Sequence, residues 1–361
     1  MLDQSRPPRT LPRPPAGRTV PAGLVAGLLC VVLLISVIIA IGLGPAAIGP
    51  LQTSRYLSAA IFGGTLPAEE ASAYQIIWQI RTPRVLLAAI VGAGLGCVGV
   101  VVQTLVRNPL ADPYVLGVSS GAAAGAVAVG SLGLLGVLGV HALSVGAFLG
   151  AAAASVLVFL AARTRVGLQP LRLVLTGVCL SFGFQALMSV IIYLVPNSES
   201  TATVLYWTMG SFGAATWSSL PVVAAVLIIG LVITYRHSRT LDLMSLGDET
   251  AASLGVRSDQ VRRRLFVITA VLTGAMVAVS GAIGFVGLVL PHLVRLLAGS
   301  GHARVIMITP PAAAIFMVWV DLLSRVVVAP RELPLGVITA LIGVPVFVGL
   351  IRRRGYHFGG R

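Results

Sequence analysis

The chain has 361 residues, of which 57% are hydrophobic and only 10% are charged. Soluble domains carry about 25% charged residues, so this composition excludes an ordinary soluble protein. Uninterrupted apolar stretches such as residues 26–44 reach the roughly 20 residues that a membrane-spanning helix needs. A membrane β-barrel would instead alternate apolar and polar residues over segments of about ten. We therefore predict an all-α polytopic membrane protein.

The net charge of +14 comes from arginine alone, because all 25 basic residues are Arg and the chain contains no Lys. These arginines flank apolar runs, which indicates membrane topology rather than binding of nucleic acid. The absence of lysine excludes a P-loop, whose motif requires that residue, and a Schiff-base lysine. The three cysteines, Cys30, Cys97 and Cys179, lie within apolar runs at spacings that fit no disulfide or metal framework.

Residues 1–20 contain four Arg and five Pro, a composition that cannot build a packed core. We predict a disordered cytoplasmic tail there. A signal peptide is the alternative, since a basic region precedes an apolar run, but that run is longer than the usual 7–15 residues.

The apolar runs then predict ten membrane helices, near residues 22–43, 84–106, 114–133, 141–162, 172–195, 219–235, 263–282, 284–298, 305–326 and 334–351. The block 263–298 is too long for one crossing and short for two. Gly281, Gly284 and the Pro291-His292 pair interrupt it, so we predict one full helix and one short helix there.

Arginine positions predict the orientation, because cytoplasmic loops carry an excess of basic residues. With both chain ends inside, 20 of the 25 arginines fall on the inner side, and the others are Arg55, Arg81, Arg84, Arg325 and Arg331. We therefore predict cytoplasmic termini, a membrane domain over residues 21–352 and a cytoplasmic tail over residues 353–361.

Few side chains within the apolar runs could carry chemistry. Asp321 is an acid at predicted membrane depth, and Arg325 lies four residues later on the same helix face. We interpret them either as a local ion pair or as a functional pair, since buried membrane charges are costly. The chain shows no HExxH, GxSxG or paired-carboxylate arrangement, so we expect no catalytic activity.

Two helix faces carry patterned small or polar residues. The helix at 84–106 places Gly92, Gly96, Gly99 and Gln103 on one face, which predicts close helix packing. The helix at 172–195 has a weakly polar face that either lines a pathway for a large, partly apolar solute or contacts another helix. That face comprises Ser181, Gln185, Met188 and Ser189.

The segment RNPLADP at residues 107–113 predicts a structural turn. An Asn-Pro step ends the preceding helix, and Asp112-Pro113 begins the next one with an N-cap and a proline in the first turn. The turn residues are Arg107, Asn108, Pro109, Asp112 and Pro113.

Eight short landmarks occur in order between residues 75 and 352: RTPR (81–84), RNPLADP (107–113), LGVSSG (116–121), WTMGSF (207–212), SLGDETAASLGV (245–256), GLVLPHLVR (287–295), ELPLG (332–336) and IGVPVF (342–347). This series resembles the iron-siderophore/haem/cobalamin (FecCD-type) family of ABC importer permeases. The resemblance implies the type II importer permease fold, with ten transmembrane helices per subunit. It also implies a homodimer or a pair of homologous permeases, and two separate cytoplasmic ATPases that bind ATP and Mg. No cofactor is expected in this chain.

The resemblance gives residues 240–262 the role of a coupling loop, whose short helices contact the ATPase. Alone, this polar stretch would be interpreted as a solvated connecting helix. Ser245 and Asp248 have the S-x-x-D spacing of a capping box, and Gly255 can provide a left-handed helix terminator. The predicted coupling residues are Ser245, Leu246, Gly247, Asp248, Glu249, Ala251, Leu254 and Gly255.

On the outer side, the resemblance implies arginine pockets that receive surface glutamates of an extracytoplasmic binding protein. Arg81 and Arg84 match the RTPR landmark, and Arg325 takes the corresponding place before ELPLG. A guanidinium suits this task because its fork binds a carboxylate through two hydrogen bonds. For Arg84, a topology anchor at the lipid headgroups is the alternative.

The resemblance thus predicts the permease of an ABC importer for a chelated metal compound, with a ferric siderophore favoured and haem or cobalamin as alternatives. It implies a multi-pass protein of the bacterial cell membrane that binds no nucleic acid. An ion-coupled secondary transporter is the alternative of another class, although it requires more intramembrane charge than Asp321 provides.

Overall fold

The computed structural model describes residues 20–164, 167–195 and 207–353. The tail predictions for residues 1–19 and 354–361 therefore lie outside the described residues. A helix occupies each of the ten predicted ranges: α1 (Ala22–Gly42), α4 (Thr82–Leu105), α5 (Val118–Leu132), α6 (Ala142–Ala162), α7 (Pro170–Leu194), α9 (Leu220–Arg236), α12 (Ser258–Ser280), α13 (Val286–Ala298), α14 (His302–Val326) and α15 (Leu335–Arg353).

The lengths of these helices differ. Within the described residues, six helical stretches are long and apolar enough to cross a membrane. A seventh candidate is α9 with α10 (Ser238–Ser245), a pair bent by 57°. The helices α5, α13 and α15 are apolar but shorter. That all ten cross the membrane stays a prediction.

Several short elements lie between the predicted helices. These are α2 (Pro50–Phe62), η1 (Ala68–Glu70), α3 (Ala71–Gln75), the π-helical η2 (Ile76–Arg81), η3 (Pro113–Leu116), η4 (Gly136–His141) and α11 (Asp248–Ser253). Strands β1 (Arg163–Thr164) and β2 (Gly167–Leu168) form a small antiparallel pair that an all-α prediction omits, with Arg163 opposite Leu168.

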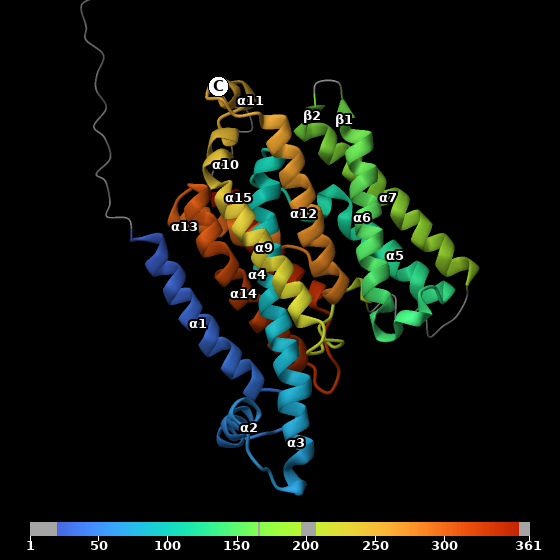
Figure 1. Cartoon of the computed structure of the whole chain (residues 1–361), viewed down its shortest axis with the longest axis vertical. Helices are drawn as coiled ribbons and strands as arrows, with labels where there is room; N and C mark the ends of the chain where they lie inside the picture. Colours follow the sequence, from blue (N-terminus) through green and yellow to red (C-terminus); the bar gives the residue numbers. More distant parts are fainter. Residues whose placement is uncertain (1–19, 165–166, 196–206, 354–361) are drawn as a thin grey trace, which may run out of the picture.

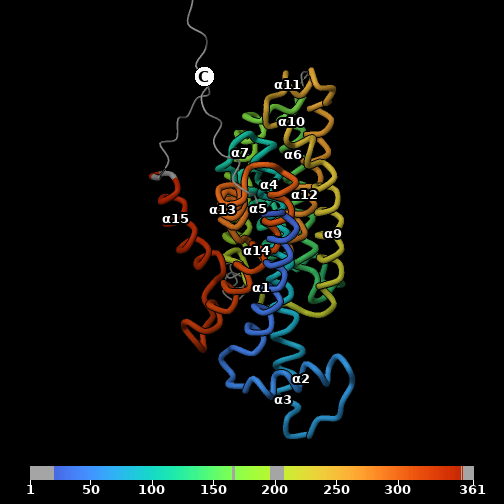
Figure 2. Tube along the Cα trace, turned by 90° about the vertical axis from the view of Figure 1, so that its left-hand side faces the viewer, coloured from blue at the N-terminus to red at the C-terminus, as the bar shows by residue number. Residues whose placement is uncertain are grey.

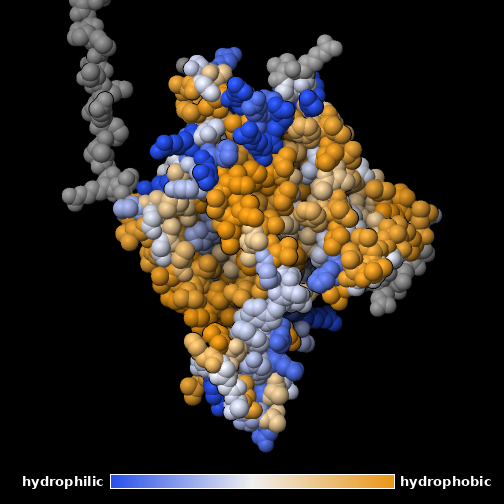
Figure 3. Space-filling model, viewed as in Figure 1, coloured by the Kyte–Doolittle hydropathy of each residue, from blue (hydrophilic) through white to orange (hydrophobic). Residues whose placement is uncertain are grey.

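The short elements gather at two opposite ends of the molecule. Figure 1 shows α10, α11, β1 and β2 at one end, which we call the α11 end, and α2 and α3 at the other, the α2 end. Figure 2 shows α15 on one flank and α9 on the opposite flank. On the face drawn in Figure 3, the surface between the two ends is predominantly hydrophobic, whereas both ends carry strongly polar patches. This distribution is typical of a protein that spans a bilayer.

The core is built around α4, which is buried almost throughout its length and contacts α14, α12, α13 and α9. Glycine makes this packing close: a Cβ added at Gly92 would lie 2.5 Å from the carbonyl oxygen of Ala313 in α14. A Cβ at Gly99 would lie 2.0 Å from the carbonyl oxygen of Gly287 in α13. The predicted packing role of this glycine face is confirmed.

Gln103 supplies a hydrogen bond that the neighbouring helix α13 lacks at its internal proline. Pro291 lies inside α13 rather than ending it, so the prediction that Pro291-His292 interrupts the helix is wrong. Proline lacks the N–H that would bond to the carbonyl four residues earlier, that of Gly287. The amide Nε2 of Gln103 donates to this carbonyl at 3.2 Å and to that of Leu288 at 3.1 Å. The helix break lies instead at residues 281–285, between α12 and α13.

Helices α5 and α6 pack through paired glycines. Both contain a G-x-x-x-G pattern, with Gly121 and Gly125 in α5 facing Gly150 and Gly146 in α6. A Cβ at Gly150 would lie 2.2 Å from the carbonyl oxygen of Gly121. Small residues at this spacing let membrane helices approach closely.

Candidate functional site

The predicted coupling segment lies at the α11 end as two short helices, α10 and α11, joined by Leu246 and Gly247. Gly247 has a φ of +114°, which favours glycine at this corner. Gly255 follows α11 with a φ of +83°, and the next amide, that of Val256, donates to the carbonyl of Ala251 at 2.9 Å. The predicted left-handed terminator is confirmed.

The predicted capping box is wrong. Ser245 lies inside α10, where its hydroxyl donates to the carbonyl of Asp242 at 2.6 Å. Gly247 is the N-cap of α11, and Asp248 is its first residue. The Asp248 carboxylate pairs instead with Arg107 and with Arg262, the latter at 2.9 Å. Charge-assisted hydrogen bonds to guanidinium groups are stronger than a bond to a neutral backbone amide, which explains the difference.

The exposed surface of this segment is partly apolar. Leu246 is 63% exposed and Leu254 is 57% exposed, while Ala251 is buried against its own chain. Glu249 is also exposed. Exposed leucines beside a polar surface suit contact with a partner that offers an apolar groove.

The predicted turn at residues 107–113 connects α4 with η3. Arg107 has a φ of +53°, unusual for a residue with a side chain. The side-chain oxygen of Asn108 accepts from the amide of Leu110 at 2.9 Å, and Pro109 continues the turn.

Asp112 caps η3, which begins at Pro113: its Oδ1 accepts from the amide of Tyr114 at 2.8 Å. The predicted N-cap is thus present, although it starts η3 rather than the longer α5. Its Oδ2 accepts from the amide of Phe285 at 3.3 Å, beside the first residue of α13. The turn is therefore fastened to the break between α12 and α13.

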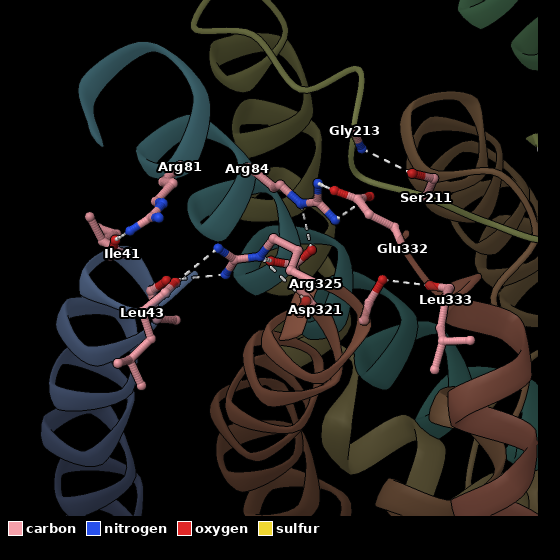
Figure 4. Close-up of polar contacts among 12 residues, drawn as sticks. Ile41, Leu43, Arg81, Arg84, Ser211, Gly213, Asp321, Arg325, Glu332 and Leu333 are labelled. Atoms are coloured by element: carbon pink, nitrogen blue, oxygen red, sulfur yellow. Dashed lines mark hydrogen bonds and ion pairs between the residues drawn. The ribbon is translucent and has the colours of Figure 1, made fainter. Parts of the chain in front are cut away.

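A buried cluster of charged residues lies at the start of α4 and the end of α14 (Figure 4), on the side of α2 and α3 (Figure 1). Asp321 is fully buried and accepts from Arg84 Nε at 2.7 Å and from Arg325 Nε at 3.0 Å. Arg84 also holds Glu332 with both ends of its fork, at 2.6 and 3.0 Å. The predicted local pair of Asp321 and Arg325 is present, but the sequence did not indicate Arg84 or Glu332 as its partners.

The remaining donors of the cluster satisfy the end of α1. Arg325 donates to the carbonyls of Ala40 and Leu43, at 3.1 and 3.2 Å. Arg81 donates to the carbonyls of Gly42, Ala46 and Ile41, at 3.0, 2.6 and 3.3 Å. The last carbonyls of a helix have no partner within the helix, so they need outside donors of this kind.

Arg81, Arg84 and Arg325 were predicted as docking residues, which must be accessible to a partner. All three are 3–5% exposed, and their guanidinium groups bind acceptors of the same chain. In this structure they join α1, α4, α14 and the loop before α15. Internal carboxylates and orphaned carbonyls therefore use the donors of these arginines in the single chain, and their docking role stays a prediction.

The predicted pathway face lies on α7, at the edge of the chain opposite α1 (Figure 1). Gln185 and Ser189 are exposed, and Ser181 and Met188 are half-buried. The two serine hydroxyls donate to carbonyls of their own helix, at 2.8 and 3.0 Å. Only Leu173 and Gly177 of α7 are buried, so most of this helix is open in the single chain. Its role in a pathway stays a prediction.

No group of three His, Cys, Asp or Glu side chains able to hold a metal occurs among residues 20–164, 167–195 and 207–353.

Comparison with known proteins gives a consistent result. The model of the FecCD transport family matches residues 32–353. The hemin transport system permease protein HmuU of Yersinia pestis is 41% identical over 281 residues, which cover 77% of this chain and 84% of HmuU. The Fe(3+) dicitrate transport system permease protein FecD of Escherichia coli is 39% identical over 280 residues, which cover 78% of this chain and 86% of FecD.

A solved structure, described as the inward-facing conformation of a metal-chelate type ABC transporter, has a TM-score of 0.79 at 32% identity. The match covers 92% of this chain and 100% of the solved chain.

Proposed function

The chain belongs to the FecCD transport family, and on that premise we propose that it is the permease subunit of an ABC importer for a ferric siderophore. It is a multi-pass protein of the bacterial cell membrane and catalyses no reaction itself. ATP and Mg are bound by two separate cytoplasmic ATPase subunits.

The observation that carries this proposal is the surface at the α11 end. Leu246, between α10 and α11, and Leu254, directly after α11, are both exposed there. The chain has no lysine for a P-loop of its own, so ATP must be hydrolysed elsewhere. The α10–α11 pair then receives the movement of the ATPase.

An extracytoplasmic binding protein docks at the α2 end in this proposal. Because Arg84 already holds Glu332, an incoming carboxylate would exchange with Glu332, the 32% exposed member of the pair. Asp321 has no exposed surface and stays with Arg84 and Arg325 through the exchange. Arg81 keeps the end of α1 in place.

The solute pathway forms where two permeases meet, either two copies of this chain or this chain and a homologue. The open face of α7, with Ser181, Gln185, Met188 and Ser189, lines it. An iron chelate is favoured as the class of solute because the named solutes of HmuU and FecD, hemin and Fe(3+) dicitrate, both hold iron in an organic chelator. Within that class, we propose a ferric siderophore. Haem and cobalamin are the alternative solutes.

An ion-coupled transporter is less favoured on a structural ground. Such a protein needs an intramembrane acid that is free to bind and release its ion. Asp321 is instead held by two guanidinium groups at 2.7 and 3.0 Å.

The proposal is tested by uptake into proteoliposomes that contain the chain, its ATPase and its binding protein. A ferric hydroxamate siderophore, hemin and cyanocobalamin are compared at equal concentration. We expect ATP-dependent accumulation of the siderophore above that of the other two. Preferred accumulation of hemin or cyanocobalamin would show that this compound, not a siderophore, is the substrate. Uptake that follows an ion gradient without ATP would contradict the proposal that the chain belongs to an ATP-driven importer.

A further inference from the structure

Arg262 connects two segments that are far apart along the chain. It lies at the start of the second turn of α12 and is only 3% exposed. Its Nη1 donates to the carbonyl of Leu168 at 2.7 Å, and its Nη2 donates to Asp248 Oδ1 at 2.9 Å. One guanidinium therefore touches both the α6–α7 connection and the first residue of α11.

Leu168 is held at both of its backbone polar groups by α12. Its amide donates to Asp259 Oδ1 at 2.9 Å, and its carbonyl accepts from Arg262. Leu168 is 2% exposed and lies two residues before α7 begins at Pro170. The helix α7 itself packs on α5, α6 and η3, and these two hydrogen bonds tie the backbone just before its start to α12.

The other arm of Arg262 reaches a helix with few other attachments. Of the six residues of α11, Ala251 alone is buried. The Asp248 carboxylate is α11's charged link to the rest of the chain, through buried Arg262 and through Arg107, whose side chain is 35% exposed. A displacement of α11 therefore pulls on Arg262 through Asp248, and Arg262, buried on α12, passes the pull to Leu168.

We propose that Arg262 is the positioning residue that transmits movement of α11 to α7. Its rigid fork keeps Asp248 and the Leu168 carbonyl at a fixed separation, so α11 and the start of α7 move together. This inference rests on the proposed function in one respect, namely that α11 is where the ATPase acts. It adds the route by which that movement reaches the face of α7.

A distance measurement on the chain alone tests the link without any transport. Spin labels are placed at Ala252 on α11 and at Leu171 on α7, both exposed, in a chain whose three native cysteines are replaced. In lipid nanodiscs, Arg262→Gln and Asp248→Asn should each broaden the distance distribution roughly twofold. The double variant should broaden it by less than the sum of the two single changes, because both remove the Arg262–Asp248 contact. Arg264→Gln, an exposed arginine on the same helix, should leave the width unchanged.

Arg262→Lys separates shape from charge. Lysine keeps the positive charge but lacks the rigid fork, so it cannot keep Asp248 and the Leu168 carbonyl at the same fixed separation. We expect an intermediate width. Unchanged distributions in Arg262→Gln and Asp248→Asn would overturn the proposal, as would equal broadening in Arg264→Gln. Because Asp248 is 40% exposed, Asp248→Asn still tests the link if Arg262→Gln fails to fold.

The reconstituted importer gives a second readout. Arg262→Gln should lower the solute transported per ATP roughly tenfold while ATP hydrolysis continues, since the charged hydrogen bonds to Asp248 and to the Leu168 carbonyl are both lost. If Arg262→Gln transported as much solute per ATP as the wild type, the proposed transmission role would be refuted. If the unmodified complex transports no chelate, the proposed function fails, while the nanodisc measurement still decides whether Arg262 links α11 to α7.

Discussion

Replacing Asp321 with asparagine probes the buried cluster at the start of α4 and the end of α14. The Asp321 carboxylate is fully buried and accepts from Arg84 at 2.7 Å and from Arg325 at 3.0 Å. Asparagine has nearly the same shape but no charge, so both guanidinium groups lose their shared counter-charge. Removing one partner of a buried ion pair costs about 3–5 kcal/mol, and two charged hydrogen bonds give a similar figure at about 1.5–3 kcal/mol each.

Two matched variants remove more exposed carboxylates, and their stability costs are compared with that of Asp321→Asn. Glu332→Gln removes the 32% exposed carboxylate from Arg84 and should cost about 1 kcal/mol, because solvent screens that pair. Glu70→Gln removes the exposed pair with Arg55, whose side chain is 51% exposed, and should cost less than about 1 kcal/mol.

The assay is the midpoint of thermal unfolding in detergent micelles at one fixed scan rate. At roughly 2 °C per kcal/mol for a large chain, Asp321→Asn should lower the midpoint by about 6–10 °C. Glu332→Gln and Glu70→Gln should lower it by about 2 °C or less. If Asp321→Asn unfolded at the same temperature as Glu70→Gln, the claim that this cluster fastens α1, α4 and α14 together would be refuted.

Three further substitutions test other contacts. Gly99→Val forces a side chain against the Gly287 carbonyl, because a Cβ at Gly99 would already lie 2.0 Å from that oxygen. The amount of folded protein recovered by size-exclusion chromatography should therefore fall sharply. Gly23→Val, where a Cβ would meet nothing within 4 Å, should leave the recovered amount unchanged. Gln103→Leu leaves the Gly287 carbonyl, which Pro291 cannot serve, without its donor and should cost about 1–3 kcal/mol by thermal unfolding; an unchanged midpoint would show that another donor replaces Gln103. Leu254→Asp puts a charge on the exposed tip beside α11 and should abolish ATP-driven uptake at normal membrane insertion; full uptake would remove the coupling role.

The places of the long helices could be predicted from the sequence because membrane insertion depends on local composition. Runs of apolar residues predicted ranges within a few residues of α4, α9 and α14. The close packing at the glycine face of α4 could also be predicted from the sequence. The paired G-x-x-x-G patterns of α5 and α6 were also present in the sequence, at residues 121–125 and 146–150, and would have predicted that contact.

Charged partners were harder to predict, because ion pairs form between residues that are distant in sequence. Arg84 and Asp321 are separated by 237 positions, and nothing local in either segment indicates the other. The S-x-x-D spacing at Ser245 was misleading for the same reason. The Asp248 carboxylate pairs with Arg262 on α12 and with Arg107 just after α4, and these stronger partners replace the local cap.

Docking residues illustrate a further limit of the sequence. A family landmark can place Arg81, Arg84 and Arg325 near one another, but it does not tell whether their donors are free. Three carbonyls, of Ile41, Gly42 and Ala46, bind Arg81 in this structure. Only the folded arrangement shows that the end of α1 must be satisfied before any partner arrives.

The central claim is that ATP hydrolysis on a separate subunit drives a ferric chelate through this chain. The most direct measurement is accumulation of radioactive ferric siderophore in proteoliposomes, with and without the ATPase subunit, in the presence of ATP and the binding protein. The account predicts ATP-dependent accumulation with the ATPase present and background levels without it. Accumulation of equal size without the ATPase subunit would contradict it.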